Sequence, residues 1–350
     1  MKKEVVIFGI DIFAKKNIYQ LECLNKNDYK LVVFSNDLKS KNYIDLPNEH
    51  YYLEATFFKR VKQIYNYLLN NKNKIHHVEI YPGGRFAPIY LMLSLFFKLK
   101  VIVVERGDLL YWNEYNFFYK KWLFIVYKLS NLVWYREPYM KNILDKIGVK
   151  NKIFLHNCIK KQREINIKLK NRDIDFLWVN RFIKERKIEW VIEVAKKYPN
   201  NRFVLVGMLQ NAKNKDIIFN QERLKKLKLK NIEIYEFQDP MRFYKRAKFF
   251  ILPSDIVFLN NALLEAMSYG IVPLISDVQN SKDIIDDGID GFIFEHIKEG
   301  FEKVIQRALK LTEEEYILMS QNVKNKVKKN FSFDVWCKKY IKMIKELNNV

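Results

Sequence analysis

The segment from Phe249 to Ser254 reads FFILPS, and the segment from Asn261 to Gly270 reads NALLEAMSYG. The first segment is an apolar run that ends at a Pro-Ser pair, which predicts a buried strand followed by a turn. The second segment predicts a helix that is capped by Asn260 or Asn261 and that ends at Gly270. A strand that leads into a helix in this way is typical of parallel α/β sheets.

The start of this predicted helix is suited to bind an anion. Its first backbone N–H groups have no partner within the helix, and the helix dipole places positive charge at the same end. Glu265 lies about one turn further on, where its carboxylate can accept hydrogen bonds from the hydroxyls of an attached sugar. The segment therefore predicts a site for a nucleotide diphosphate, with the backbone of Asn261 and Ala262 on the phosphates.

Apolar strand-like runs alternate with longer amphipathic segments, and the length of 350 residues agrees with two α/β domains. In the first domain we expect strands at 5–10, 30–35, 77–81, 101–104, 132–135 and 152–155, and helices at 57–69, 88–98, 117–129 and 139–146. In the second we expect strands at 175–180, 202–206, 232–237, 249–252, 272–276 and 291–294, and helices at 188–197, 221–228, 242–247, 262–269, 281–286 and 300–311. The predicted domains are residues 1–160 and 174–331, with a linker at 161–173 and a C-terminal helix at 332–350 that returns to the first domain.

Composition restricts the class of protein less than the motifs do. The net charge of +22 attracts polyanions such as nucleic acid, anionic lipid or phosphorylated substrates. A chain rich in Lys, Asn, Ile, Phe and Tyr is equally expected from an AT-rich genome. Because no RNA- or DNA-binding motif is present, we expect no nucleic acid partner.

The cysteines and the apolar runs predict a cytoplasmic protein. Cys23, Cys158 and Cys337 are far apart, odd in number and without metal-ligand spacing, which indicates a reducing compartment and no disulfide. No signal peptide opens the chain. The longest apolar stretch, at 86–97, is about half as long as a membrane-spanning helix.

A basic loop follows the first strand of the second domain. Arg181 and Arg186 lie in it, and two guanidinium groups can hold a diphosphate by paired hydrogen bonds. The same loop can equally be a solvated basic turn. Further on, a buried strand ends at Gly207 and Met208, where a glycine lets the backbone approach a ligand. The turn at Gln238 supplies backbone groups to a base edge or is only a turn.

In this order the segments resemble the donor-binding domain of glycosyltransferase family 4. The likeness covers about residues 174–340. It lies in Asn180-Arg181 with Arg186, Val206-Gly207, Pro253-Ser254, 265–270, 272–275, Asp287-Gly288 and 290–292. The resemblance implies the α/β fold called GT-B, in which two doubly wound Rossmann-like domains face each other across a cleft.

The resemblance also implies roles for the residues that carry it. Arg181 and Arg186 would hold the donor diphosphate and act in catalysis. Glu265 would bind the ribose hydroxyls, and the backbone near Gly207 and Gln238, with Met208, would face the base.

Three positions depart from the family pattern. Val257 stands where the family has the first Glu of a Glu-x7-Glu segment, Phe258-Leu259 replace a Gly-Phe pair, and Arg186 replaces a lysine. Asp255 either compensates for the missing carboxylate or is an ordinary surface aspartate near a helix cap.

The first domain matches the family less closely. Its glycine-rich turn is reduced to Gly9, which the resemblance assigns to donor binding. Glu105 stands near the family's mid-domain His-Asp pair, where a carboxylate can orient or deprotonate an acceptor hydroxyl. The alternative is a structural ion pair between Glu105 and Arg106 or Arg85. Arg85 and Asp108 are further candidates for the acceptor side.

The sequence also makes predictions about metals, cofactors and lipid. The five histidines lack ligand spacing and no Asp-x-Asp follows a strand, so we expect a metal-independent enzyme. No cofactor is expected besides the substrate, a UDP- or GDP-linked sugar. The aromatic and lysine residues of 117–129 either lie at an anionic membrane surface or belong to a core-facing helix with snorkelling lysines.

The resemblance implies a retaining glycosyltransferase that moves a sugar from a nucleotide-diphosphate donor to a glycan or lipid-linked acceptor. The expected context is bacterial surface polysaccharide or lipopolysaccharide biosynthesis, in the cytoplasm or at the inner face of the cytoplasmic membrane. The alternative is a non-catalytic nucleotide-sugar-binding or scaffold protein with a degenerate site, which Val257 suggests.

Overall fold

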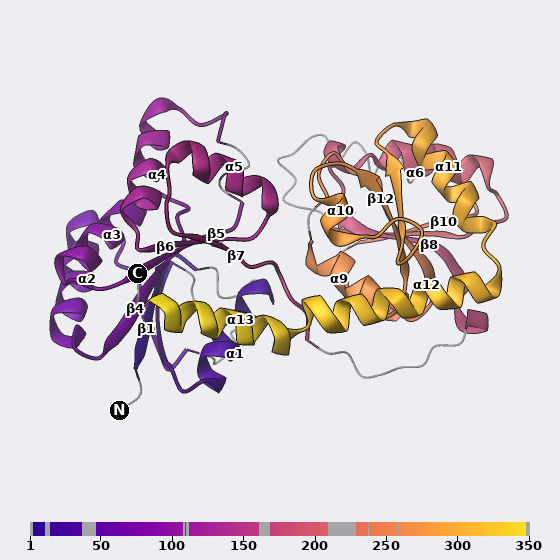
Figure 1. The fold of residues 1–350 in the computed structure, drawn as a ribbon. Helices are drawn as coiled ribbons and strands as arrows, with labels where there is room; N and C mark the ends of the chain where they lie inside the picture. Colours follow the sequence, from indigo (N-terminus) through magenta and orange to yellow (C-terminus); the bar gives the residue numbers. More distant parts are fainter. Residues whose placement is uncertain are drawn as a thin grey trace. The chain divides into compact units, whose positions relative to one another are not determined.

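The computed structural model describes residues 3–10, 15–36, 47–107, 109, 112–160, 169–208, 229–236, 238–257 and 259–347. These residues form two compact units, and Figure 1 shows the elements of each. The N-terminal unit consists of Met1–Cys158 together with Phe333–Val350, and the C-terminal unit is Ile159–Ser332.

The N-terminal unit is built on a parallel sheet of seven strands in the order β3-β2-β1-β4-β5-β6-β7. The strands are β1 Glu4–Phe8, β2 Lys30–Ser35, β3 Glu49–Tyr52, β4 Ile75–Ile80, β5 Val101–Glu105, β6 Leu132–Tyr135 and β7 Lys152–Phe154. The helices are α1 Lys15–Lys26, α2 Phe57–Asn71, α3 Ala87–Phe96, α4 Phe117–Leu129, α5 Pro138–Ile147 and α13 Phe333–Glu346.

Successive residues of these strands point to opposite faces of the sheet, and each face has its own core. Val6 and Phe8 pack with α2 to α5, whereas Val5 and Ile7 pack with α1 and α13. Both faces are covered by helices, so most residues of the central strands are apolar, with buried exceptions such as His77 and Glu79 on β4. β3 was not expected because its sequence, EHYY, is a half-exposed edge strand without an apolar run.

The C-terminal unit has a six-stranded parallel sheet in the order β10-β9-β8-β11-β12-β13. The strands are β8 Ile174–Arg181, β9 Phe203–Met208, β10 Ile232–Tyr235, β11 Ala247–Leu252, β12 Val272–Asp277 and β13 Phe292–Glu295. The helices are α6 Ile188–Lys197, α8 Met241–Tyr244, α9 Asn261–Ser268, α10 Ser281–Ile284, α11 Lys298–Leu309 and α12 Glu313–Lys326.

The expectation of two doubly wound α/β sheets is confirmed. The helix expected at 221–228 lies outside the described residues. α12 was not expected, although a capping box formed by Thr312 and Glu315 marks its start. In the C-terminal sheet the strand order reverses at β8, between β9 and β11, and ligands of such sheets bind at this point.

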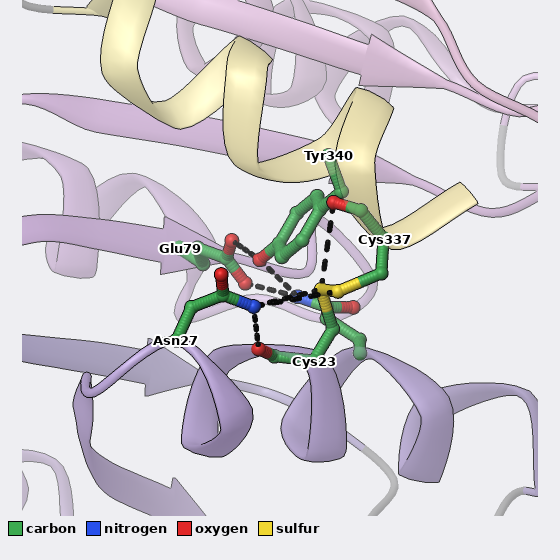
Figure 2. The surroundings of a disulfide bond; sticks show 6 residues. Cys23, Asn27, Glu79, Cys337 and Tyr340 are labelled. Carbon is green, nitrogen blue, oxygen red and sulfur yellow. Dashed lines mark hydrogen bonds between the residues drawn. A yellow bond between two sulfur atoms is a disulfide. The ribbon is translucent and has the colours of Figure 1, made fainter. Parts of the chain in front are cut away.

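The expectation that the chain has no disulfide is wrong. Cys23 on α1 and Cys337 on α13 are bonded, with a Cα–Cα distance of 5.6 Å, and Figure 2 shows the bond beside Tyr340 and Glu79. The two cysteines are 314 residues apart in sequence. They meet because α13 is part of the N-terminal unit and packs against α1. Sequence spacing does not reveal such a contact.

Candidate functional site

The carboxyl ends of β8 and β11 lie side by side in the C-terminal sheet, because these two strands pair directly. β8 ends at Arg181 and continues into a single 3-10 turn, Lys184–Arg186. β11 ends at Leu252, and the loop after it leads to α9. The basic loop and the start of the predicted anion-binding helix are therefore at the same edge of one sheet.

Arg186 connects these two loops. Its Nη1 donates hydrogen bonds to Ser254 Oγ at 2.6 Å and to the carbonyl oxygen of Ile256 at 2.8 Å. The backbone N–H of Asp255 donates to the carbonyl of Glu185 at 2.9 Å, and Ser254 is fully buried. The guanidinium is thus held in a fixed position at the edge of the sheet.

Arg181 differs from Arg186 in its surroundings. It is exposed, and within the described ranges its side chain forms no hydrogen bond or ion pair. The two arginines expected to hold a diphosphate are at the same edge, but only Arg186 is fixed by protein groups.

Asp255 is occupied by two neighbours that the sequence did not assign to the site. Lys187 Nζ and His296 Nε2 each lie 2.7 Å from Asp255 Oδ1. Burial raises the pKa of Asp255, but hydrogen bonds from Lys187 and His296 outweigh it, so that the pKa lies below its ordinary value. Two sequence positions could have pointed to these partners of Asp255. Lys187 comes directly after Arg186, and His296 comes directly after β13.

Val257 is fully buried in the core beneath α9. The carboxylate of the family pattern is therefore replaced by a packing residue. Asp255 is paired with Lys187 and His296, and its side chain remains 36% exposed.

The helix α9 is capped by Asn260. The side chain of Asn260 accepts a hydrogen bond from the backbone N–H of Leu263 at 2.8 Å, so Asn261 is the first residue of the helix. In this arrangement the N–H groups of Asn261 and Ala262 are those that the helix and its cap do not use. They are suited to contact an anion.

Glu265 is only 8% exposed and lies in the second turn of α9. Burial and the neighbouring Glu265 carboxylate raise the pKa of the Tyr244 hydroxyl well above its ordinary value. Tyr244 was not a candidate from sequence, because its position beside Glu265 depends on the packing of α8 under the sheet edge.

Glycine is required at position 207 for a packing reason that the sequence does not reveal. A Cβ atom added at this position would lie 1.7 Å from the ring of Phe182, which is fully buried. The glycine is therefore required by this aromatic ring. Met208 ends β9 and pairs with Arg181, and Gln238 is half-buried in the turn after β10.

In the N-terminal unit, Gly9 follows β1 with a φ of +75°, and a Cβ there would be 3.1 Å from the carbonyl oxygen of Tyr81. This backbone conformation favours glycine. Arg85 is exposed and stacks on Phe86, 5.1 Å from the ring centroid. Asp108 lies outside the described residues.

Glu105 is fully buried, which favours its structural alternative over a role on an acceptor hydroxyl. Its Oε1 accepts hydrogen bonds from the backbone N–H groups of Gly107 at 2.6 Å and Leu109 at 3.2 Å. Its Oε2 accepts from the hydroxyl of Tyr127. The partners are backbone groups and a tyrosine, where the sequence analysis named Arg106 or Arg85.

Two features are absent from the described part of the chain. No group of three or more His, Cys, Asp or Glu residues is arranged to hold a metal ion. None of the helices there is both long enough and apolar enough to cross a membrane.

Both the sequence of the C-terminal unit and the fold are similar to those of known proteins. Residues 160–326 match the family model "Glycosyl transferases group 1". The chain is 28% identical over 159 residues to the capsular polysaccharide biosynthesis glycosyltransferase CapH of Staphylococcus aureus, covering 42% of this chain and 44% of CapH. It is 25% identical over 171 residues to the UDP-Gal:alpha-D-GlcNAc-diphosphoundecaprenol alpha-1,3-galactosyltransferase of Escherichia coli, covering 47% and 43%. The chain thus matches less than half the length of these two relatives.

Solved structures match over nearly the whole chain. Anabaena HepE in complex with UDP superimposes with a TM-score of 0.80 at 10% identity, covering 98% of this chain and 100% of HepE. The lipopolysaccharide outer core galactosyltransferase WaaB superimposes with a TM-score of 0.70 at 14% identity, covering 99% of both chains. At these identities the likeness establishes the fold, which is that of GT-B glycosyltransferases.

Proposed function

We propose that the chain transfers a sugar from a nucleotide-diphosphate donor to a glycan or lipid-linked acceptor, because residues 160–326 match the family model of the group 1 glycosyltransferases. The observation that carries this proposal is the carboxyl edge of β8 and β11. It brings together Arg181, Arg186, the free start of α9 and Glu265.

The relatives narrow the chemistry of both substrates. HepE was solved with UDP and with UDP-glucose, which favours a UDP-linked donor over a GDP-linked one. CapH acts in capsular polysaccharide biosynthesis, and the Escherichia coli relative uses an acceptor linked to diphosphoundecaprenol. We therefore assign the chain to surface polysaccharide or lipopolysaccharide biosynthesis.

In the proposed reaction, the bond between the sugar and the diphosphate breaks while negative charge grows on the diphosphate. Arg181 and Arg186 stabilise this charge as it develops, and the N–H groups of Asn261 and Ala262 contribute from α9. Glu265 holds the ribose hydroxyls. The reaction proceeds with retention of the anomeric configuration. It needs no metal ion, since the two arginines supply the positive charge.

Nucleotide binding provides the first test. UDP and UDP-sugars are expected to raise the melting temperature, because a ligand that binds only the folded protein stabilises it. Glu265→Gln is expected to weaken UDP binding about tenfold, since it removes a charged acceptor. Arg307→Ala, at an exposed arginine paired with Asp287, is the matched control and should bind UDP normally. The absence of any shift with UDP, GDP and their sugars overturns the proposal.

A non-catalytic nucleotide-sugar-binding protein is the second candidate, and the buried Val257 is the observation that favours it. The two candidates differ in consumption of the donor. Tight UDP binding, together with no release of UDP from any UDP-sugar on glycan or lipid-linked acceptors, supports the non-catalytic protein.

We further propose that the N-terminal unit works at an anionic membrane surface on the cytoplasmic side. α2, α3 and α4 pack side by side on one face of the sheet. Their outer surface exposes large apolar side chains, among them Phe58 at 83%, Phe96 at 68% and Phe118 at 81%. α2 contains Lys and Arg, α4 contains Lys, α3 has no charged residue, and none of the three helices contains Asp or Glu. Aromatic side chains with lysines and without acids suit the interface of an anionic bilayer.

Vesicle sedimentation tests this surface. The protein is expected to bind vesicles that contain phosphatidylglycerol, more weakly at high salt. Phe58→Ser with Phe118→Ser should reduce the bound fraction strongly. Leu318→Ser, at a residue of the C-terminal unit that is 60% exposed, should not. Equal binding of all three proteins contradicts the proposal.

A further inference from the structure

Two arginines are stacked against one tryptophan at the carboxyl edge of the N-terminal sheet. Arg106 follows β5 directly and Arg136 follows β6 directly. Their Cζ atoms lie 5.6 Å and 5.1 Å from the ring centroid of Trp134. Trp134 is fully buried, and its indole N–H donates to the carbonyl of Leu155 at 2.9 Å, so the ring is a fixed platform for both guanidinium groups.

The hydrogen-bond partners of both arginines are neutral. Arg106 Nη2 donates to Gln20 Oε1 and to the Tyr81 hydroxyl, both at 2.6 Å. Arg136 Nη1 donates to Asn157 Oδ1 at 2.8 Å. Neither arginine has an ion pair with any carboxylate of the described residues.

Several of their N–H donors have no partner. Nε and Nη1 of Arg106 and Nε of Arg136 are shielded from solvent and donate to no acceptor within the described structure. Arg136 is only 5% exposed, whereas Arg106 is half-buried, so the pair extends from the interior towards the surface. Buried donors of this kind are rare in folded proteins, because each one costs free energy.

Like charge adds to this cost. Burial, followed by the positive charge of Arg106, lowers the pKa of Arg136 well below its ordinary value. Of the nearby carboxylates, Glu79 acts on Arg106 and Glu137 on Arg136 only at a distance. Glu79 is itself occupied by hydrogen bonds from Gln20 and Tyr340. The folded protein thus maintains one buried and one half-buried positive charge, and neither has an ion-paired carboxylate among the described residues. Proteins ordinarily avoid such charges.

We propose that Arg106 and Arg136 form an oxyanion-binding site on the N-terminal unit that recognises a phosphate or carboxylate group of the acceptor. A guanidinium binds such groups through paired, planar hydrogen bonds, and the unpartnered N–H groups are the donors for them. The proposal rests on the proposed function for the identity of its ligand as an acceptor. The anion site itself is a property of these residues alone.

Titration of the full chain with inorganic pyrophosphate, followed by calorimetry, tests the site. The wild type is expected to bind at two sites, one on each unit. Arg181→Ala with Arg186→Ala should remove the C-terminal site only. Arg106→Gln with Arg136→Gln should remove the N-terminal site only and leave UDP affinity unchanged. Arg60→Gln is the matched control, because Arg60 is 6% exposed and also stacks on an aromatic ring, Phe86.

Melting temperatures separate this role from a structural one. Since the pair is uncompensated, Arg136→Gln is expected to leave the melting temperature of the ligand-free protein unchanged or higher. Arg136→Lys keeps the positive charge but loses the planar pair of guanidinium N–H donors. It should therefore weaken pyrophosphate binding about tenfold while the protein stays folded. A lower melting temperature with unchanged pyrophosphate binding overturns the proposal.

A third arm distinguishes the two sources of the oxyanion. Pyrophosphate and glucuronate are titrated against the Arg181→Ala, Arg186→Ala protein, in which the N-terminal site is the one that remains. Tighter binding of pyrophosphate assigns a phosphorylated acceptor, and tighter binding of glucuronate assigns an acidic sugar. If neither ligand binds, the N-terminal site is refuted, while UDP binding by the wild type still supports the proposed function.

Discussion

The carboxyl edges of the two sheets both carry positive charge, but they hold it differently. In the C-terminal unit, Arg186 is bonded to Ser254, and Lys187 is paired with Asp255. The two loops that follow β8 and β11 are thereby fastened to each other before any ligand arrives. A ligand at this edge meets a basic loop whose geometry is already fixed.

In the N-terminal unit, Arg106 and Arg136 rest on Trp134 and bond only to neutral groups. No carboxylate of the described residues forms an ion pair with either arginine, and Glu79 and Glu137 act on them only at a distance. The C-terminal edge is therefore stabilised by its own side chains. The N-terminal edge retains an unfavourable free energy of burying charge, which an anionic ligand would remove.

Arg186→Ala is expected to produce the largest effect at the compensated edge. In the proposed reaction it removes a donor to the leaving diphosphate, and it also releases Ser254 and Ile256. Turnover of the UDP-sugar should fall about 100- to 1000-fold, as when one preorganised donor of an active site is removed. Release of UDP from the donor measures it.

Arg186→Lys is the matched variant, because the family pattern has a lysine here. It should retain much more activity than Arg186→Ala. Normal turnover in the alanine variant would show that Arg186 fastens the loops without taking part in transfer.

The disulfide tests whether the N-terminal unit depends on its covalent link. Cys337→Ser opens a loop that spans nearly the whole chain, so it should lower the free energy of unfolding by about 2–5 kcal/mol. Urea unfolding with and without reductant measures this. Cys158→Ser, at the free and buried cysteine, should remain sensitive to reductant. Equal sensitivity of the wild type and Cys337→Ser to reductant contradicts a stabilising bond.

The two edges also differ in how far the sequence alone predicts them. The candidate C-terminal site could be proposed from sequence because its signals are local: Arg181 and Arg186 share one loop, and Asn260 precedes the helix that carries Glu265. Strand and helix positions were predicted for the same reason, since apolar runs and caps lie within short windows.

The N-terminal edge was not predicted, because it is made by contacts between distant segments. Arg106 and Arg136 belong to different strand ends and meet only at Trp134. The bond between Cys23 and Cys337 likewise requires α13 to return to α1. Glu105 was assigned correctly to a strand end, but its burial depends on Tyr127, which lies on another element.

Gly207→Ala tests whether the C-terminal edge depends on Phe182 packing. The added methyl group would overlap the Phe182 ring, so we expect a loss of about 1–3 kcal/mol in the free energy of unfolding. Phe182→Leu makes room for the methyl group, and the double variant should lose less than the sum of the single variants. Additive losses, measured by urea unfolding, would show that Phe182 is not the group that requires glycine.

Asp255→Asn has the smallest expected effect. It tests whether the Asp255 carboxylate compensates the positive charge of Lys187 at the C-terminal edge. The folded-state pKa of Asp255 lies below its unfolded value, so its ion pair contributes stability above pH 4, and this contribution is lost as the pH falls through the folded pKa. Because the pair is partly exposed, we expect a loss of about 0.5–1 kcal/mol at pH 7. The difference from the wild type should disappear once the pH lies below the folded-state pKa, where the carboxyl is protonated in both states. A difference that is independent of pH would mean that Asp255 acts through packing rather than charge, and the contrast between the two edges would lose its electrostatic basis.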